Sequence, residues 1–105
     1  TMALYLVSVY RPIGFDPAPS LDAGAHREID QLNDEMVAAG VRVFVGGLQL
    51  PSTATWLGPE VPPVTGDAYL DGFWVLDVAH LDEALGWGRK AGIACRALVE
   101  VRPFH

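Results

Sequence analysis

Cysteine and basic side chains are scarce in this sequence of 105 residues, which has a single cysteine, Cys95, and seven lysines and arginines against thirteen acidic residues. One cysteine excludes a disulfide framework and any metal site built from several cysteines, and it fits the reducing cytoplasm, where we expect the protein to reside. The formal net charge of -6 excludes the basic stripe that general nucleic-acid binders use. We therefore expect no nucleic-acid partner.

Long hydrophobic runs are also missing. The apolar stretch at residues 2–9 is far shorter than the ~20 residues that a membrane-spanning helix needs. No basic residue precedes this stretch and no small-residue cleavage site follows it, so it does not match a signal peptide either. We expect no membrane partner. Thr1 ahead of Met2 is interpreted as an expression remnant, which leaves residues 2–105 as a single domain.

Apolar residues are abundant. They make up 50% of the sequence, charged residues make up 19%, and the mean hydropathy is +0.24. A disordered chain has the opposite balance, with low hydrophobicity and high charge. A chain of 11.3 kDa is long enough for one compact domain and too short for two.

Hydrophobic periodicity predicts four strands and two helices. We expect the strands at residues 3–10, 41–48, 72–78 and 95–101. The first helix is expected to begin at Ser20 or Asp22 and to end before Gly40, where a left-handed conformation is needed. The second is expected over about 80–91, ended by Gly92. Residues 51–66 are interpreted as a loose hairpin or loop.

This order predicts the α+β class. Two strand–helix–strand halves with right-handed crossovers give a four-stranded antiparallel sheet with both helices on one face, the split βαβ or ferredoxin-like plait. The strands at residues 3–10 and 72–78 are apolar on both sides, although two helices can cover only one face of such a sheet. Because soluble monomers rarely expose so large an apolar face, we expect a homodimer with the two sheets packed face to face. The alternative is a monomer whose segment 51–70 folds back over the sheet.

Three stretches carry a resemblance to a known family: AAGV at 38–41 before LQLP at 48–51, LDGFWVLDV at 70–78 before LDEALGW at 81–87, and VEVRPF at 99–104. Together they resemble the YCII-related family, in particular its DGPF-domain branch. The resemblance implies a ferredoxin-like plait that dimerises as an α/β barrel. It also implies an activity that is largely undefined, with a catalytic role proposed for a His and an Asp near a cleft.

The chain departs from that family at two points. The Asp-Gly-Pro-Phe run of the branch would fall at residues 64–70, where VTGDAYL stands instead, so the motif is shortened or lost. The family's helical His would fall about one turn after His26, near Ile29 or Asp30.

His26 and Asp30 are the candidate catalytic residues. They lie four positions apart on one expected helix, close enough for the carboxylate to orient the imidazole as a general base requires. The same spacing is equally ordinary on a solvated helix surface.

Five residues are candidate ligand contacts. Asp67 and Asp71 precede the third expected strand and could line the mouth of a cleft. Arg11 at a strand end would suit a carboxylate or phosphate on a small substrate. Tyr10 and Trp74 are further candidates, for which packing in the core or in a dimer interface is the alternative.

No cofactor or metal is expected. Cys95 sits in an apolar pattern with no base near it in sequence, which favours a buried, inert thiol over a nucleophile. His26, His80 and His105 lie far apart without the spacing of metal ligands, and His80 is interpreted as a helix cap.

Two functions remain open. The first is a small enzyme that transfers a proton on a small organic molecule held between sheet and helices, with His26 as base and Asp30 as its orienter. The second is a non-catalytic dimeric ligand-binding or accessory module. A pocket on which no polar groups converge, or one filled by Trp74 and Tyr10, would favour the second.

Overall fold

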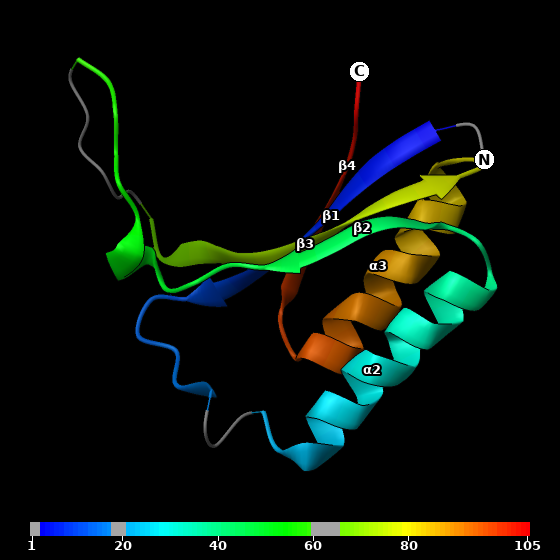
Figure 1. Ribbon diagram of the computed structural model, residues 1–105, viewed down its shortest axis with the longest axis horizontal. Helices are drawn as coiled ribbons and strands as arrows, with labels where there is room; N and C mark the ends of the chain where they lie inside the picture. The colour runs from blue at the N-terminus through cyan, green and yellow to red at the C-terminus, as the bar shows by residue number, and fades with distance from the viewer. Residues whose placement is uncertain (1–2, 18–20, 60–65) are drawn as a thin grey trace.

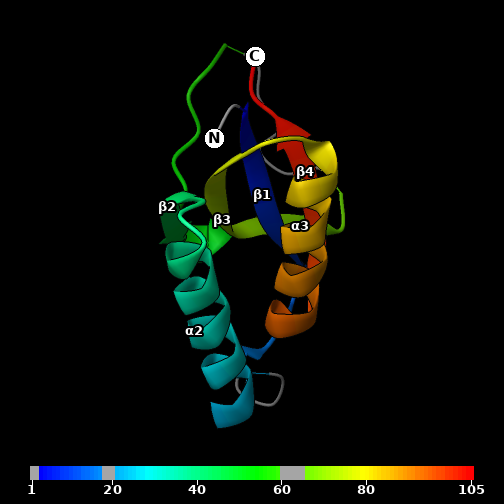
Figure 2. The ribbon, with the colours of Figure 1, turned by 90° about the vertical axis from the view of Figure 1, so that its right-hand side faces the viewer.

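The computed structural model describes residues 3–17, 21–59 and 66–105. Its elements are β1 (Ala3–Pro12), α2 (Ala23–Ala38), β2 (Arg42–Gly47), the 3-10 turn η1 (Pro51–Thr53), β3 (Ala68–Val78), α3 (Leu81–Cys95) and β4 (Leu98–Pro103). The strands form one antiparallel sheet in the order β2-β3-β1-β4, and both helices lie on the same side of it (Figures 1 and 2). The expected α+β class, antiparallel sheet and two helices are confirmed, and the strand order fits a ferredoxin-like plait.

The hydrophobic core lies between the sheet and the two helices. The sheet contributes fully buried residues such as Val7 and Leu76, and α2 contributes Leu32 and Met36. Small buried residues on α3, such as Ala91, let that helix approach the sheet closely. Within the described ranges, neither helix is long and apolar enough to cross a membrane.

The ends of α2 follow the sequence signals. Oδ1 of Asp22 accepts a hydrogen bond of 2.9 Å from the backbone N–H of Ala25, which caps the helix. That hydrogen bond lowers the pKa of the Asp22 carboxyl below its ordinary value. Gly40 follows the helix with a φ of 71°, as expected of a residue in the left-handed region. Ser20, the other expected cap, lies outside the described residues.

The expected end of the second helix was wrong. α3 continues through Gly92 to Cys95, and β4 therefore begins at Leu98 rather than at Cys95. Gly92 is not among the described glycines with a positive φ, so the helix continues through it, and a Cβ there would lie 3.4 Å from the backbone oxygen of Ala97, an ordinary contact distance. Arg96 ends the helix instead, in the left-handed region with a φ of 52°.

The first and third strands are longer than expected. β1 extends to Pro12 and β3 begins at Ala68, because Arg11 pairs with Tyr69 and Pro12 with Ala68. A register shift between Val9 and Tyr10 accompanies this extension. Strand pairing therefore continues through Pro12, although a proline cannot donate a hydrogen bond to the sheet.

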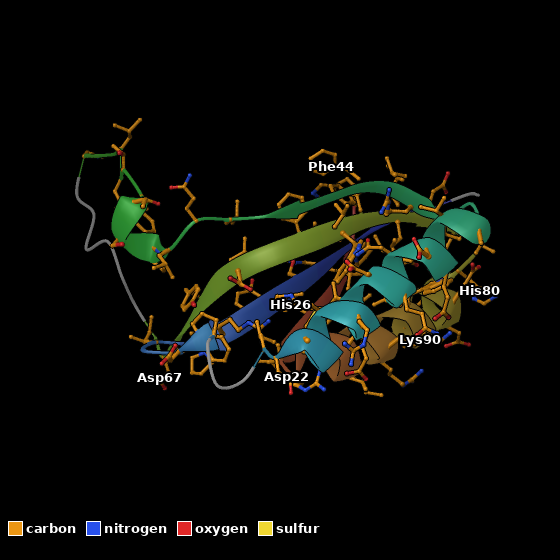
Figure 3. The ribbon with its side chains drawn as sticks, turned by 60° about the horizontal axis from the view of Figure 1, so that its bottom comes forward. Asp22, His26, Phe44, Asp67, His80 and Lys90 are labelled. Atoms are coloured by element: carbon orange, nitrogen blue, oxygen red, sulfur yellow. The ribbon has the colours of Figure 1, made fainter. Side chains whose placement is uncertain are left out.

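Strict alternation does not hold along β2. It would place Arg42 and Phe44 on the same side of the sheet, but a bulge between them pairs Arg42 with Leu76 and Phe44 with Val75. Arg42 lies on the helix side, where its Nη1 donates to Oδ1 of Asn33 at 3.1 Å. Phe44 points to the other side of the sheet, away from the helices (Figure 3).

The face of the sheet opposite the helices, here called the open face, is largely apolar. Strand pairing and alternation assign to it Leu4, Leu6, Ser8, Tyr10, Phe44, Gly46, Leu70, Phe73, Val75, Asp77, Leu98, Glu100 and Arg102. Leu4, Phe44, Leu70 and Leu98 among them are exposed. The rings of Phe44 and Phe73 lie 6.0 Å apart across β2 and β3. The apolar second face that the sequence predicts is therefore present.

Residues 48–59, here called the arm, connect β2 towards β3 and stand off the body of the molecule (Figure 1). A 3-10 turn at Pro51–Thr53 is its only regular element in the described part, in agreement with the loop expected there. Residues 52–59 are all exposed, and this part of the arm does not fold back over the open face. Residues 60–65, which complete the connection, lie outside the described residues.

Two glycines on α3 provide a test of how this helix packs against β4. A Cβ at Gly88 would lie 2.6 Å from Cγ2 of Val101, so Gly88→Ala should lower the free energy of unfolding by about 1–3 kcal/mol through overpacking. A Cβ at Gly86 meets nothing within 4 Å, so Gly86→Ala should raise it by about 1 kcal/mol through helix propensity. Urea unfolding of the two variants measures both changes. A shift in the same direction for both would contradict the packing of α3 on β4.

Candidate functional site

The structure does not bring His26 and Asp30 together. Both side chains are exposed on α2, and no hydrogen bond or ion pair joins them in the described part of the chain. Figure 3 places His26 apart from Asp67, the acidic residue that precedes β3. The spacing of four correctly puts the pair on one helix, but both side chains are exposed there and neither lines either of the two cavities beside α3. A general base oriented by a carboxylate is not assembled here.

Arg11 and Asp71, in contrast, are brought together. Nε of Arg11 lies 3.2 Å from Oδ2 of Asp71, and the Arg11 side chain is only 3% exposed. Nη1 of Arg11 also donates to the backbone oxygens of Cys95 and Arg96 at the end of α3. The ring of Phe15 covers the guanidinium, with its centroid 4.7 Å from Cζ.

This arrangement ties the end of β1 to the end of α3. A cation next to the last carbonyls of a helix is stabilised by the helix dipole as well as by the hydrogen bonds themselves. The guanidinium is thereby occupied by protein groups, so the contact with a substrate carboxylate or phosphate expected for Arg11 is not supported. Asp67 contributes through its backbone oxygen, which accepts a hydrogen bond of 2.8 Å from the N–H of Ile13.

Trp74 and Tyr10 lie on opposite faces of the sheet. Trp74 is 4% exposed on the helix side, where its Nε1 donates to Oδ1 of Asn33 at 2.9 Å. Tyr10 is half-buried on the open face, opposite Leu70 on β3 and Leu98 on β4. They cannot line one pocket within a single chain. For Trp74 the packing alternative holds, because it fills the space between the sheet and α2.

Cys95 is buried at the end of α3. Burial raises the pKa of its thiol above the ordinary value, and the nearby Arg11 guanidinium only partly opposes this effect. The expected strand position was wrong, because Cys95 is the last residue of a helix, but the expected burial is confirmed. A thiol with a raised pKa carries little thiolate at neutral pH and is a poor nucleophile.

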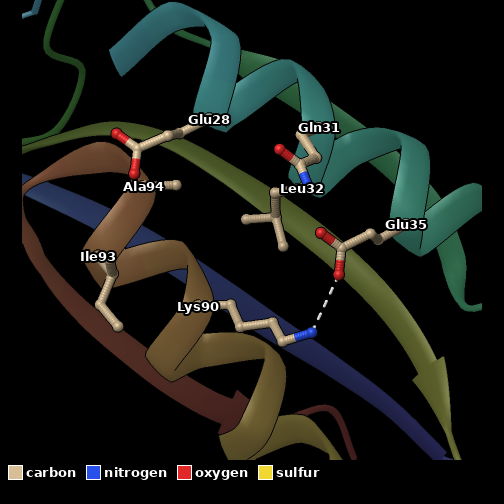
Figure 4. A pocket seen from close by; sticks show the side chains of 7 residues that line it. All are labelled: Glu28, Gln31, Leu32, Glu35, Lys90, Ile93 and Ala94. Atoms are coloured by element: carbon tan, nitrogen blue, oxygen red, sulfur yellow. Dashed lines mark hydrogen bonds and ion pairs between the residues drawn. The ribbon is translucent and has the colours of Figure 1, made fainter. Parts of the chain in front are cut away.

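Two shallow cavities flank α3. One, of about 240 Å³, lies between the helices and is lined by Glu28, Gln31, Leu32, Glu35, Lys90, Ile93 and Ala94 (Figure 4). Its carboxylates are already paired, Glu35 with Lys90 at 3.0 Å and Glu28 with Arg96 at 2.7 Å. These pairs join α2 to α3 and leave an apolar floor between them. Because these charged side chains pair with one another, they do not indicate which ligand the cavity would bind.

The second cavity, of about 300 Å³, is here called the α3/β4 groove. It is lined by Leu85, Gly88, Arg89, Gly92, Ala97, Leu98, Val99 and Val101. Arg89 is the only charged residue in this lining. The sequence reasoning missed this groove, although two glycines four positions apart on one helix are a signal that could have found it.

No candidate metal centre emerges: residues 3–17, 21–59 and 66–105 contain no group of three or more His, Cys, Asp or Glu side chains arranged to hold an ion. No protein-family model matches the chain, and no curated protein matches it. What the chain does must therefore be argued from its own residues.

Arg11→Met tests the structural role of the buried guanidinium. The substitution keeps an unbranched side chain like the aliphatic part of arginine but leaves the carbonyls of Cys95 and Arg96 without their donor, so it should lower the free energy of unfolding by about 2–3 kcal/mol. Arg102→Met is the matched control, because the Arg102–Glu100 pair is exposed and should contribute less than about 1 kcal/mol. Equal losses in chemical denaturation would contradict the role given to Arg11.

The burial of Cys95 and the raised pKa of its thiol predict that the thiol reacts slowly with disulfide reagents. In the folded protein at mildly alkaline pH, an aromatic disulfide reagent should label the thiol at least about 100-fold more slowly than it labels the chain in concentrated urea. Absorbance of the released thiolate measures both rates. Rapid labelling of the folded protein would show that the thiol is accessible and reactive.

Proposed function

We propose that this chain is one subunit of a homodimer in which two open faces pack against each other, and that the dimer is a non-catalytic binding or accessory module. The open face carries the proposal, because exposed Leu4, Phe44, Leu70 and Leu98 all lie on the side of the sheet that no helix covers. Apolar surface of this extent on a small protein marks an interaction site. A two-fold axis would let identical faces cover each other.

The position of the arm favours coverage of the open face by a second copy of the chain over coverage by the chain's own segment. The alternative expected from the sequence was that the segment around the arm folds back over the sheet. Residues 52–59 instead stand free of the open face, and residues 66–67 lead directly into β3, which already contains residues 68–70. Within the described part of the chain, nothing covers the open face, which favours a partner of matching shape and chemistry.

The packing of Trp74 favours a module without catalysis. An enzyme of the expected kind needs a pocket between sheet and helices, and Trp74 occupies that space with its N–H satisfied by Asn33. His26 and Asp30 face solvent without contacting each other, so no observation favours proton transfer by this pair. A small organic ligand would instead bind at the rim of the open face, where Tyr10 and the Glu100–Arg102 ion pair offer polar groups.

We further propose membership in the YCII-related family, in its DGPF-domain branch. The three motifs at residues 38–51, 70–87 and 99–104 and a strand order that fits a ferredoxin-like plait support it. The α/β-barrel dimer of that family agrees with face-to-face packing of two open faces. A free, buried Cys95 suits a reducing compartment, and we place the protein in the cytoplasm on that basis.

Phe44→Asp tests the proposed dimer. Phe44 is 56% exposed in the single chain, so the carboxylate leaves the protomer folded but places a charge within the proposed interface. Sedimentation velocity at micromolar concentration should show a dimer for the original sequence and a monomer for the variant.

Val37→Asp is the matched control, since Val37 on α2 is also 56% exposed but lies outside the open face. It should remain a dimer. A single-chain species for the original sequence, or equal effects of the two substitutions, would refute the proposed interface. Circular dichroism of each variant verifies that it is folded.

A further inference from the structure

We propose that each arm reaches around the edge of the partner's sheet and seats Trp56 and Leu57 in the partner's α3/β4 groove. This inference rests on the proposed homodimer and adds to it a second contact and a defined orientation. The occupant is a second copy of this chain. Four features of the protomer support it: the composition of the arm, the size and chemistry of the groove, the position of the root of the arm along the strands, and the direction in which the arm projects.

The arm is apolar and unburied. Trp56 is 56% exposed and Leu57 is 89% exposed, and Leu48 and Leu50 are exposed as well. Residues 48–59 contain no charged side chain, in a chain whose net charge is -6. An uncharged segment can approach an acidic second copy without repulsion. Its exposed tryptophan and leucines gain stability only when another surface covers them.

The α3/β4 groove matches that segment in size and chemistry. Its volume of about 300 Å³ lies among aliphatic side chains and two glycines, with Arg89 as the one charge in its lining. A guanidinium can stack on the face of a tryptophan ring, so Arg89 is suited to hold Trp56 at the groove entrance. Leu98 belongs to both the groove and the open face, which makes the two surfaces continuous.

Strand register puts the arm and the groove at the same height on the sheet. Gly47, the last residue before the arm, pairs with Gly72, which pairs with Val9, which in turn pairs with Val99 of the groove. The root of the arm and the groove therefore lie in one row, at opposite edges of the sheet. In a dimer with a two-fold axis parallel to the strands, β2 of one protomer faces β4 of the other. Positions along the strands are unchanged by this rotation, so the root of the arm stays level with the partner's groove.

The arm also points in the required direction. It leaves the end of β2 on the side of the sheet to which Phe44 points, away from the helices (Figures 1 and 3). This is the side on which the partner lies. Packed sheets are separated by about 10 Å. The ten residues from Leu48 to Leu57 can span on the order of 30 Å when extended, which is enough to pass the partner's β4 and enter the groove.

Disulfide cross-linking tests the contact directly. Leu57→Cys combined with Arg89→Cys should give an interchain disulfide, seen as a dimer band on a non-reducing gel, after mild oxidation. Leu57→Cys combined with Val37→Cys is the matched control, and Leu57→Cys alone controls for a bond between two arms. Adding Phe44→Asp to the first pair should abolish the band, because it removes the proposed interface. Cys95 is buried and should not compete.

Affinity provides the second measurement. The double substitution Trp56→Ser with Leu57→Ser removes side chains that are exposed in the protomer, so the fold should persist while the dissociation constant of the dimer rises on the order of 100-fold. Val37→Ser should leave that constant unchanged. A different result is that the protein dimerises while the 57/89 pair cross-links no faster than the 57/37 pair and the double substitution leaves the affinity unchanged. This result overturns the arm contact but not the dimer. A monomeric original sequence overturns the dimer and the arm contact together.

Discussion

The structure depends on a mismatch between a sheet that is apolar on both faces and two helices that can cover only one of them. Adjacent residues of β3 show the consequence: Trp74 is buried under α2, whereas Phe73 faces the opposite side, where its ring lies 6.0 Å from that of Phe44. Burial of apolar area is the main source of folding free energy, so an uncovered apolar face is surface that folding leaves unburied. Among the described residues no segment of the chain covers that face, and the proposed function follows from that constraint.

A second constraint acts at the corner where β1, β3 and α3 end. Arg11 is the one charged residue among the buried side chains described, and its donors go to Asp71 and to the last carbonyls of α3. A buried guanidinium with these partners is a tie between elements, since its charge is matched by a carboxylate and by the helix dipole. Cys95 lies within the same corner. Its burial and raised pKa belong to this packing and not to a nucleophile.

Periodicity in the sequence predicts the elements and the apolar second face because alternation and helical spacing depend only on local order. It could not predict the bulge between Arg42 and Phe44 or the passage of α3 through Gly92, since both depend on what lies across the sheet or beside the helix. The same limit applies to the site. A spacing of four puts His26 and Asp30 on one helix but does not say whether they meet a cavity, and the tie between Arg11 and Cys95 joins residues 84 positions apart.

The two buried or partly buried glycines of α3 beside β4 differ in a way that bears on the arm. Each disfavours the helix by about 1 kcal/mol relative to alanine. At Gly88 the missing side chain is compensated within the protomer, because Val101 occupies the space that a Cβ would need. At Gly92 the nearest atoms lie 3.4 and 3.7 Å from an added Cβ, in ordinary contact range, so an alanine would fit, and the groove beside it stays open. Packing inside one chain therefore accounts for Gly88 but not for Gly92. Under the proposed arm contact, a partner's tryptophan in the groove would account for Gly92, because a side chain at position 92 would then compete with the arm for the same space.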